Sequence, residues 1–386
     1  MLYQGEQVRH LDVERFILRV FGQAHHKKRL QSIASAALGV ISAGSLIIHR
    51  IGQGMAGALD LMPKHAIKQV DRLLSNDKFA LWDCFEQWVP YILGARKEIV
   101  VAMDWTEFDL DNQSTLALNM VTAHGRATPL IWKTVDKGSL KGKRNAYEDE
   151  CLLKLRALIP ADINVTILAD RGFCDTQLFT YLTGYLGFHF VIRIRKSLLV
   201  TDKKGEQRKA KDWLGKQGRA KTLKQAKLTN KEQRIGTVVC VQAKKMKSAW
   251  CLAASDEQLS GTQIIRWYAK RWGIEPQFRD SKDIHFGMGL SHTHINHPHR
   301  RDRLLFISAV AVAVLTLLGA AGEQLGMDRG LKANTVKHRT LSLFRQGYYY
   351  FHQLERMASD KATRLLDAFE QQLKKHQQLS NILGVL

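Results

Sequence analysis

The sequence has few residues of the kinds that build disulfide-linked or disordered proteins. Its five cysteines lie far apart and include no C-x-x-C pair, which excludes a disulfide framework and a cysteine-based zinc finger. Only six of its 386 residues are proline, while 45% are hydrophobic, so the chain can bury a large core and is not a disordered tail. It also lacks a glycine-rich phosphate-binding loop, and we therefore expect no requirement for a nucleoside triphosphate.

Acidic residues are scarce relative to basic ones. The chain has 58 Lys and Arg against 36 Asp and Glu, a net charge of +22. Such an excess indicates a polyanionic partner, either nucleic acid or an acidic membrane surface. Residues 196–247 hold 16 of the basic residues and 4 of the acidic ones, with few large apolar residues. This composition predicts an insertion with a strongly basic surface.

Long uncharged runs are also rare. The N-terminus has no apolar stretch of the kind found in signal peptides. Residues 304–322 form one uncharged run that is long enough to cross a bilayer. We interpret it as a buried helix of a large core, because the chain offers no second run of comparable length, and we expect no membrane partner.

The order of sequence patterns predicts an α/β fold. Helical periodicity up to about residue 92 is followed by three short β-rich runs, and then by strands that alternate with helices. A meander followed by alternating elements is typical of a mixed sheet with helices on both faces. We therefore divide the chain as follows: a helical region, 1–92; a core, 93–195 and 249–300; a β-rich insertion, 196–248; and a helical C-terminal region, 301–386.

Two aspartates follow buried strands. Asp104 ends the run EIVVAM, and Asp170 ends the run NVTILA. Open α/β sheets bind their ligands at this edge, and two carboxylates placed there repel each other unless a divalent cation lies between them. The alternative is structural, since a strand-end aspartate often caps the next turn.

A third set of polar residues recurs with helical spacing. Tyr268, Arg271, Glu275 and Lys282 fall on one face of a predicted helix, at about 100° per residue. A solvated face with an i,i+4 ion pair would give the same pattern. Bulky apolar neighbours favour a half-buried helix instead. Cations beside a metal-binding carboxylate suit a phosphodiester backbone.

The spacing of these four residues resembles the Y-R-E-K signature of the DDE transposases of bacterial insertion sequences, specifically the insertion-sequence-four family. Asp104 within MDWT and Asp170 within ADRGF resemble the first and second aspartates of that family. Three further segments resemble its Tn-ten-like branch: 67–77, 278–294 and 333–347. One departure is Pro276, where many relatives carry an acidic residue, and a proline there is able to kink the helix just past Glu275.

This resemblance implies an RNase H-like catalytic core, interrupted by a β-strand domain between the second aspartate and the glutamate. It also implies that residues 1–92 bind DNA and that residues 301–386 serve dimerisation and core packing. Three carboxylates would hold two Mg²⁺ ions, with Mn²⁺ able to substitute: Asp104, Asp170 and Glu275. Five further residues would contact DNA, with the tryptophan stacking on a flipped base: Tyr268, Arg271, Lys282, Trp250 and Arg193.

The function implied is cut-and-paste DNA transposition by two-metal phosphoryl transfer, through end nicking, hairpin formation and resolution, and strand transfer. The partners would be terminal inverted repeats, target DNA and a second copy of the chain in a synaptic complex, in the bacterial cytoplasm at the nucleoid. Two alternatives remain open. One is a metal-dependent endonuclease without strand transfer, and the other is a non-enzymatic DNA-binding regulator, which leaves the aligned carboxylates unexplained.

Overall fold

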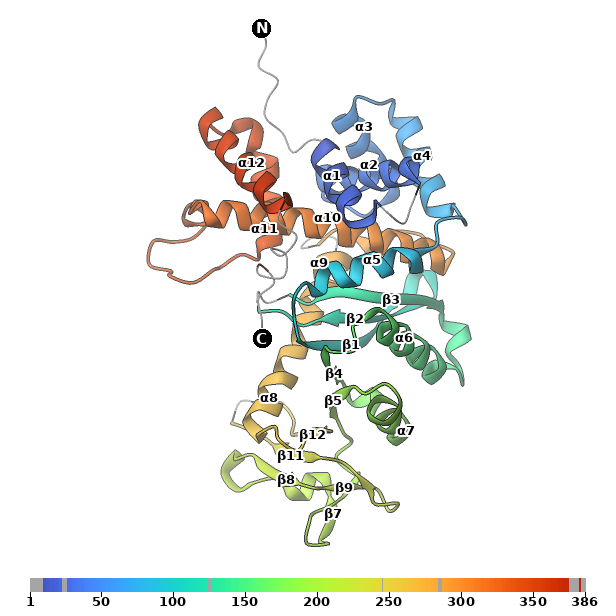
Figure 1. The fold of residues 1–386 in the computed structure, drawn as a ribbon, viewed down its shortest axis with the longest axis vertical. Coiled ribbons are helices and arrows are strands. Elements are labelled where there is room, and N and C mark those ends of the chain that lie inside the picture. The colour runs from blue at the N-terminus through green and yellow to red at the C-terminus, as the bar shows by residue number, and fades with distance from the viewer. Residues whose placement is uncertain are drawn as a thin grey trace.

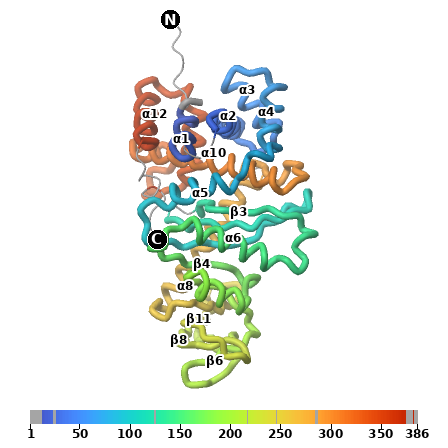
Figure 2. Tube along the Cα trace, turned by 45° about the vertical axis from the view of Figure 1, so that its right-hand side comes forward, coloured from blue at the N-terminus to red at the C-terminus, as the bar shows by residue number. Residues whose placement is uncertain are grey.

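The computed structural model describes residues 10–22, 26–123, 126–244, 246–283, 287–374 and 382. The predicted regions 1–92, 196–248 and 301–386 are therefore described only in part. Residues 284–286 of the segment 278–294 also lie outside the described residues. The N-terminal helices lie at one end of the molecule, and the strands of the basic insertion lie at the other (Figures 1 and 2).

Helices make up the N-terminal region, as predicted. In chain order they are α1 (His10–Phe21), α2 (Lys27–Ala43), α3 (Ile48–Leu59), α4 (Pro63–Ser75) and α5 (Leu81–Leu93). In α4 the proline occupies the first turn, where its missing N–H is not needed, and Val70, Leu73 and Leu74 form a buried stripe. The helix α5 leaves this group and packs on the sheet (Figure 1).

The centre of the molecule is a mixed sheet of eight strands in the order β3-β2-β1-β4-β5-β12-β11-β8. The strands are β1 (Glu98–Phe108), β2 (Gln113–Met120), β3 (Thr128–Asp136), β4 (Asn164–Ala169), β5 (His189–Arg193), β8 (Lys221–Lys224), β11 (Thr237–Val241) and β12 (Trp250–Ala254). Strands β1, β4 and β5 run parallel, and the other pairs are antiparallel. This is the mixed α/β sheet that the sequence predicts.

Side-chain alternation along the strands separates two apolar layers. Val101 of β1 packs in the layer that contains Leu152 of α6 (Arg144–Leu158) and Phe179 of α7 (Thr176–Thr180). Val100 and Ala102 pack in the opposite layer, under α8 (Gly261–Lys270) and α9 (Ile274–Lys282). Helices therefore cover both faces, and the parity of a strand residue decides which helices its side chain meets.

The uncharged run forms the helix α10 (Pro298–Gln324). Among the described helices, it alone is long and apolar enough by itself to cross a membrane. The helices α2 and α3 would be long and apolar enough only if the two together formed one span, and they are bent by 98° relative to each other. Of the apolar 18-residue stretch within α10, 83% is buried in the protein. Burial of this extent is what a core helix requires, and it agrees with our interpretation of the run.

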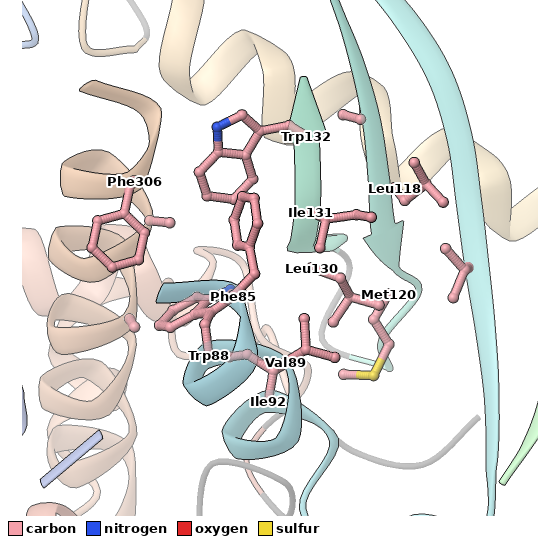
Figure 3. Packing of buried hydrophobic residues seen from close by; sticks show 14 of the residues in the cluster. Phe85, Trp88, Val89, Ile92, Leu118, Met120, Leu130, Ile131, Trp132 and Phe306 are labelled. Carbon is pink, nitrogen blue, oxygen red and sulfur yellow. The ribbon is translucent and has the colours of Figure 1, made fainter. Parts of the chain in front are cut away.

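Aromatic side chains join α10 and α5 to the sheet (Figure 3). Phe85 of α5 meets Trp132 of β3 edge to face, with ring centroids 4.7 Å apart. Asp302, at the start of α10, accepts a hydrogen bond of 2.9 Å from the backbone N–H of Thr134 in β3. Burial raises the pKa of Asp302 to about 7. This edge of the sheet is thus fixed by apolar packing and by a buried carboxyl.

The helices α11 (Leu343–Gln353) and α12 (Ser359–Lys374) follow α10. Gly347 of α11 lies against α10 so closely that a Cβ there would be 1.8 Å from the backbone oxygen of Leu315. A glycine is therefore required at this helix crossing. The close approach explains why α11 packs tightly on the core.

The basic segment is β-rich, as predicted. Four short strands form a second sheet in the order β10-β9-β6-β7. They are β6 (Leu199–Thr201), β7 (Gln207–Lys209), β9 (Lys227–Leu228) and β10 (Gln233–Arg234). Two strands of the same segment, β8 and β11, instead extend the main sheet beyond β12. The insertion bounds 196–248 stay a prediction, and the sheet is continuous across them.

The predicted helix through Glu275 forms, with a 3-10 turn inside it. The helices α8 and α9 are separated by a 3-10 turn at Arg271–Gly273, so the break precedes the glutamate rather than following it. Pro276 is the third residue of α9, where no intrahelical donor is needed. The Gly273 carbonyl accepts a hydrogen bond of 3.1 Å from the N–H of Ala127, so the connection between β2 and β3 holds the break.

Candidate active site

Asp104 and Asp170 lie side by side at the carboxyl edge of the parallel strands. The pairing of β1 with β4 ends at Met103 opposite Ala169, and each aspartate is the next residue of its chain. Two residues earlier, Ala102 pairs with Leu168, and both pack in the layer under α8 and α9. Because side chains alternate along strands, both carboxylates lie on that same face.

The same alternation brings two other predicted residues to this face. Arg193 of β5 pairs with Leu252 of β12, which packs in the layer under α8. Trp250 lies two residues before Leu252, and its half-buried indole meets the Tyr268 ring edge to face at 4.9 Å. Asp104, Asp170, Arg193 and Trp250 therefore belong to one face of four adjacent strands.

Arg193 and Trp250 differ in how they are held. The guanidinium of Arg193 donates to the Ser248 hydroxyl at 2.8 Å and to the Ala249 carbonyl at 3.0 Å. These contacts fix the end of the basic loop before Trp250. The Trp250 side chain is only partly buried, whereas the other residues of β12 are buried.

Arg271 contacts carboxylates from both sides of the site. Its Nη1 donates to Oδ2 of Asp104 at 3.1 Å, and its Nη2 lies 3.7 Å from Oε1 of Glu275. The arginine side chain is only 9% exposed, whereas that of Glu275 is 50% exposed. Within the described part of the chain, the buried Nε of Arg271 has no hydrogen-bond partner. Arg271 is thus a buried cation between two candidate ligands.

The electrostatics of Asp104 reflect its neighbours. Burial raises the pKa of this carboxyl most strongly, the Arg271 guanidinium lowers it, and the charges of Asp170 and Glu275 raise it again, to about 6. Each of the other two carboxylates is therefore close enough to repel a charge on Asp104. The three predicted catalytic residues form one acidic cluster.

Asp170 also has the structural role that the sequence left open. Its Oδ1 accepts a hydrogen bond of 2.7 Å from the N–H of Gly172 and caps a 3-10 turn. A Cβ at Gly172 would lie 2.9 Å from that same oxygen. The glycine of ADRGF thus leaves space for the carboxylate, and the cap orients Asp170 at the edge.

The structure adds two residues that the sequence reasoning missed. Alternation turns Trp105 to the opposite face from Asp104, where its indole N–H donates to Oε1 of Glu148 at 2.8 Å. Arg144 lies over the Trp105 ring, 5.1 Å from its centroid, and 3.4 Å from the Glu148 carboxylate. Burial raises the pKa of Glu148. In the acidic run YEDE nothing distinguishes Glu148 from its neighbours, so only the tryptophan after Asp104 could have signalled a partner.

Tyr268 and Lys282 flank Arg271 and Glu275 along the helical run, and the Arg271 guanidinium lies 5.7 Å from the centroid of the Tyr268 ring. Tyr268 is 2% exposed and packs under Trp250. The Lys282 ammonium donates to the Thr106 hydroxyl at 3.1 Å and to the Glu107 carbonyl. Thr106 follows Asp104 by two residues on β1 and therefore lies on the same face. The 3-10 turn at Arg271–Gly273 lies between Tyr268 and Glu275 in this run.

The donor chemistry of the cluster fits a hard divalent cation. All three side chains offer carboxylate oxygens, the ligands that Mg²⁺ and Mn²⁺ prefer. In the described ranges of the chain, no three His, Cys, Asp or Glu side chains already stand in a metal-holding arrangement. Arg271 instead lies against the carboxylates of Asp104 and Glu275. The residues therefore fit the ion by their chemistry, and the Arg271 guanidinium lies against two of them.

A mixed sheet with acidic residues at the carboxyl edge of its central strands, on a strongly basic chain, defines a metal-dependent enzyme that acts on nucleic acid. Residues 96–313, more than half of the chain, match the family model of the transposase DDE domain. The chain belongs to this family and is a DDE transposase, a DNA-cleaving enzyme that uses divalent metal ions. The fold is accordingly RNase H-like, as the resemblance implied. No curated protein matches the chain.

Proposed function

We propose that this transposase moves an insertion sequence by cut-and-paste transposition, and that it belongs to the insertion-sequence-four family and its Tn-ten-like branch. The observation that carries the proposal is the acidic cluster, in which Asp104 and Asp170 end paired parallel strands and Glu275 shares Arg271 with Asp104. A regulator that only bound DNA would have no need of three mutually repelling carboxylates, which cost stability when no cation is bound.

We assign the metal site to three residues: Asp104, Asp170 and Glu275. Two Mg²⁺ ions bound there would activate the attacking oxygen and stabilise the leaving oxygen of an in-line phosphoryl transfer. Asp104, whose pKa is raised by both of the other carboxylates, would serve both ions. The cap at Gly172 orients Asp170, and the hydrogen bond from its own strand, Trp105 N–H to Oδ1 at 3.0 Å, orients Asp104.

The DNA would lie along the face that carries the carboxylates. Trp250 offers a half-exposed ring on which a flipped base can stack, a contact worth roughly 1–3 kcal/mol. Arg193 holds the loop before this ring and lies on the same face. Arg271 and Lys282 carry the charge that would position phosphates, and Tyr268 supports the Trp250 ring.

The remaining features of the proposal follow from the same family. The partners would be the terminal inverted repeats and the target DNA, bound by a homodimer in the synaptic complex. The helical regions 1–92 and 301–386 would bind DNA and join the two copies. We place this activity in the bacterial cytoplasm, at the nucleoid.

The experiment is an assay of the two reactions on one substrate. Purified protein is incubated with Mg²⁺, a labelled duplex that ends in the inverted repeat of the element, and a supercoiled target plasmid. We expect nicked and hairpin products from the end, followed by joining of the end to the plasmid. Cleavage without joined product under any target condition would instead establish an endonuclease that lacks strand transfer.

A further inference from the structure

Arg271 lies where the metal ligands need to approach one another. Its two terminal nitrogens are 3.1 Å from Asp104 and 3.7 Å from Glu275. An ion shared by these carboxylates would lie about 2.0–2.1 Å from their oxygens and draw them together. A guanidinium and a divalent cation cannot occupy that space together, because of their size and their like charge. Arg271 and the cation therefore compete for the same two carboxylates.

The buried position of Arg271 also has an energetic cost. It is almost fully buried, and its Nε has no hydrogen-bond partner among the described residues. A buried donor without a partner costs about 1–3 kcal/mol. The ion pair with Glu275 is long, and that carboxylate is half exposed. A partner with more acceptor oxygens, placed on the open side of the site, would compete well for this side chain.

A DNA phosphate is such a partner. Guanidinium groups bind phosphates through two parallel hydrogen bonds, and this geometry can use Nε together with one terminal nitrogen. Capture of DNA would thereby free Oδ2 of Asp104 and Oε1 of Glu275.

We propose that Arg271 couples DNA capture to metal binding: without DNA it neutralises Asp104 and Glu275 and opposes cation entry, and with DNA it turns to a phosphate and opens the site. The inference rests on the proposed function of the acidic cluster. Its consequence is that the free protein binds divalent cations weakly, so that the cutting machinery is assembled only on DNA. By linkage, the cation must in turn strengthen DNA binding by the same factor.

The test measures binding of Mn²⁺ alone to the full chain without DNA, from the free-ion signal in electron paramagnetic resonance. Arg271→Ala is expected to lower the Kd for Mn²⁺ by about tenfold or more, within the range of ordinary coupling between sites. The control is Arg279→Ala, which removes the same charge from an exposed position on α9. We expect the control to change the Kd by less than about twofold, because exposed charges are screened.

Arg271→Lys provides a second variant that keeps the charge. A single ammonium cannot span both carboxylates as the two nitrogens do, so its Kd is expected to fall between those of the wild type and Arg271→Ala. If Arg271→Ala proves unfolded in a thermal scan, the Kd values of the wild type and Arg271→Lys for Mn²⁺ test the proposal instead. An unchanged or weaker Mn²⁺ affinity, or an equal gain in Arg279→Ala, would overturn the proposal.

A second measurement separates this inference from the proposed function. Fluorescence anisotropy gives the affinity of wild type and Arg271→Ala for an end duplex with and without Mn²⁺. We expect Mn²⁺ to strengthen DNA binding of the wild type by the larger factor. If the wild type cleaves DNA but both proteins show the same factor, the coupling is wrong while the function stands. If the wild type neither binds nor cleaves the duplex, the proposed function fails first.

Discussion

Asp104 and Asp170 reach the site from paired parallel strands, whereas Glu275 reaches it from a short helix that follows a break. The strand side is fixed by backbone pairing up to Met103 and Ala169 and by apolar layers on both faces. The helix side is attached through separate contacts, among them Ala127 to Gly273. Backbone pairing allows one register, while separate contacts can be made and broken singly. We therefore regard the strand side as the fixed half of the site and the helix side as its adjustable half.

The strongest test of this comparison removes one carboxylate at a time. Asp104→Asn, Asp170→Asn and Glu275→Gln should each lower the rate of end cleavage in Mg²⁺ by at least about a thousandfold, because each loses a charged metal ligand worth several kcal/mol. DNA binding in gel shifts should stay near that of the wild type. A near-normal rate in any one variant would remove that residue from the ligand set.

The matched control uses the other end of the same strand. Asp162 precedes β4 as Asp170 follows it, and it forms an exposed ion pair with Lys97. Asp162→Asn should leave the cleavage rate within about twofold of the wild type, since exposed pairs contribute little. An equal loss in Asp162→Asn would show that the effect arises from the strand as a whole.

The next effect concerns the pH dependence of the fixed half. Burial raises the pKa of Asp302 from an ordinary value of 3.8 to about 7. Between these values the folded protein holds a proton that the unfolded chain has lost, so the free energy of unfolding should fall as pH rises from about 4 to about 7. The loss should reach a few kcal/mol, at about 1.4 kcal/mol per unit of pKa shift.

Asp302→Asn keeps an acceptor for the Thr134 N–H but cannot ionise. Urea unfolding of this variant should show a flatter pH profile over the same window and greater stability than the wild type at pH 8. The same slope in both proteins would mean that another group titrates.

A smaller effect is expected at Glu148, which accepts a hydrogen bond from the Trp105 indole. Glu148→Ala leaves the partly buried indole N–H of Trp105 without this acceptor, and it should lower the free energy of unfolding by about 1–2 kcal/mol. Because Trp105 adjoins Asp104, the cleavage rate should also fall in the folded variant. Glu148→Gln retains an acceptor oxygen and should restore most of both quantities, measured by urea unfolding and by end cleavage. Failure of Gln to restore either would require the charge of Glu148 itself.

The smallest effect is expected on the adjustable half. Pro276 lies in the first turn of α9, where alanine fits without strain. Pro276→Ala should lower the free energy of unfolding by only about 0.4–1 kcal/mol, through greater freedom of the unfolded chain. A loss above about 2 kcal/mol in urea would show that the helix side depends on this proline as strictly as the strand side depends on its pairing.

The same difference explains what could be predicted from sequence. Buried strands have a period of two, so the positions of Asp104 and Asp170 follow from where the apolar runs end. The face shared with Arg193 and Trp250 follows from strand order, which a single sequence does not contain. The resemblance to a known family supplied those two residues, and the structure shows the surface on which they lie.

The helix side was predicted less well because its geometry depends on tertiary contacts. Helical periodicity correctly placed Arg271 near Glu275 but did not predict the 3-10 turn at Arg271–Gly273. The break is stabilised by the Ala127 N–H, which comes from a distant connection between strands. Lys282 donates to the Thr106 hydroxyl of β1, which is likewise a tertiary contact. Local pattern alone does not report such contacts.

The continuous main sheet fixes the distance between the strand that carries Asp104 and the basic edge of the sheet. From β1, which carries Asp104, five strand-to-strand steps lead to β8 at the basic edge. At about 4.8 Å per step this separation is roughly 24 Å, which corresponds to about seven base pairs at 3.4 Å each along a duplex laid across the strands. Backbone hydrogen bonds set this length, and side chains do not. In the proposed binding mode, substitutions on the surface of the insertion would change which bases are contacted, while the distance from those bases to the cut would stay the same.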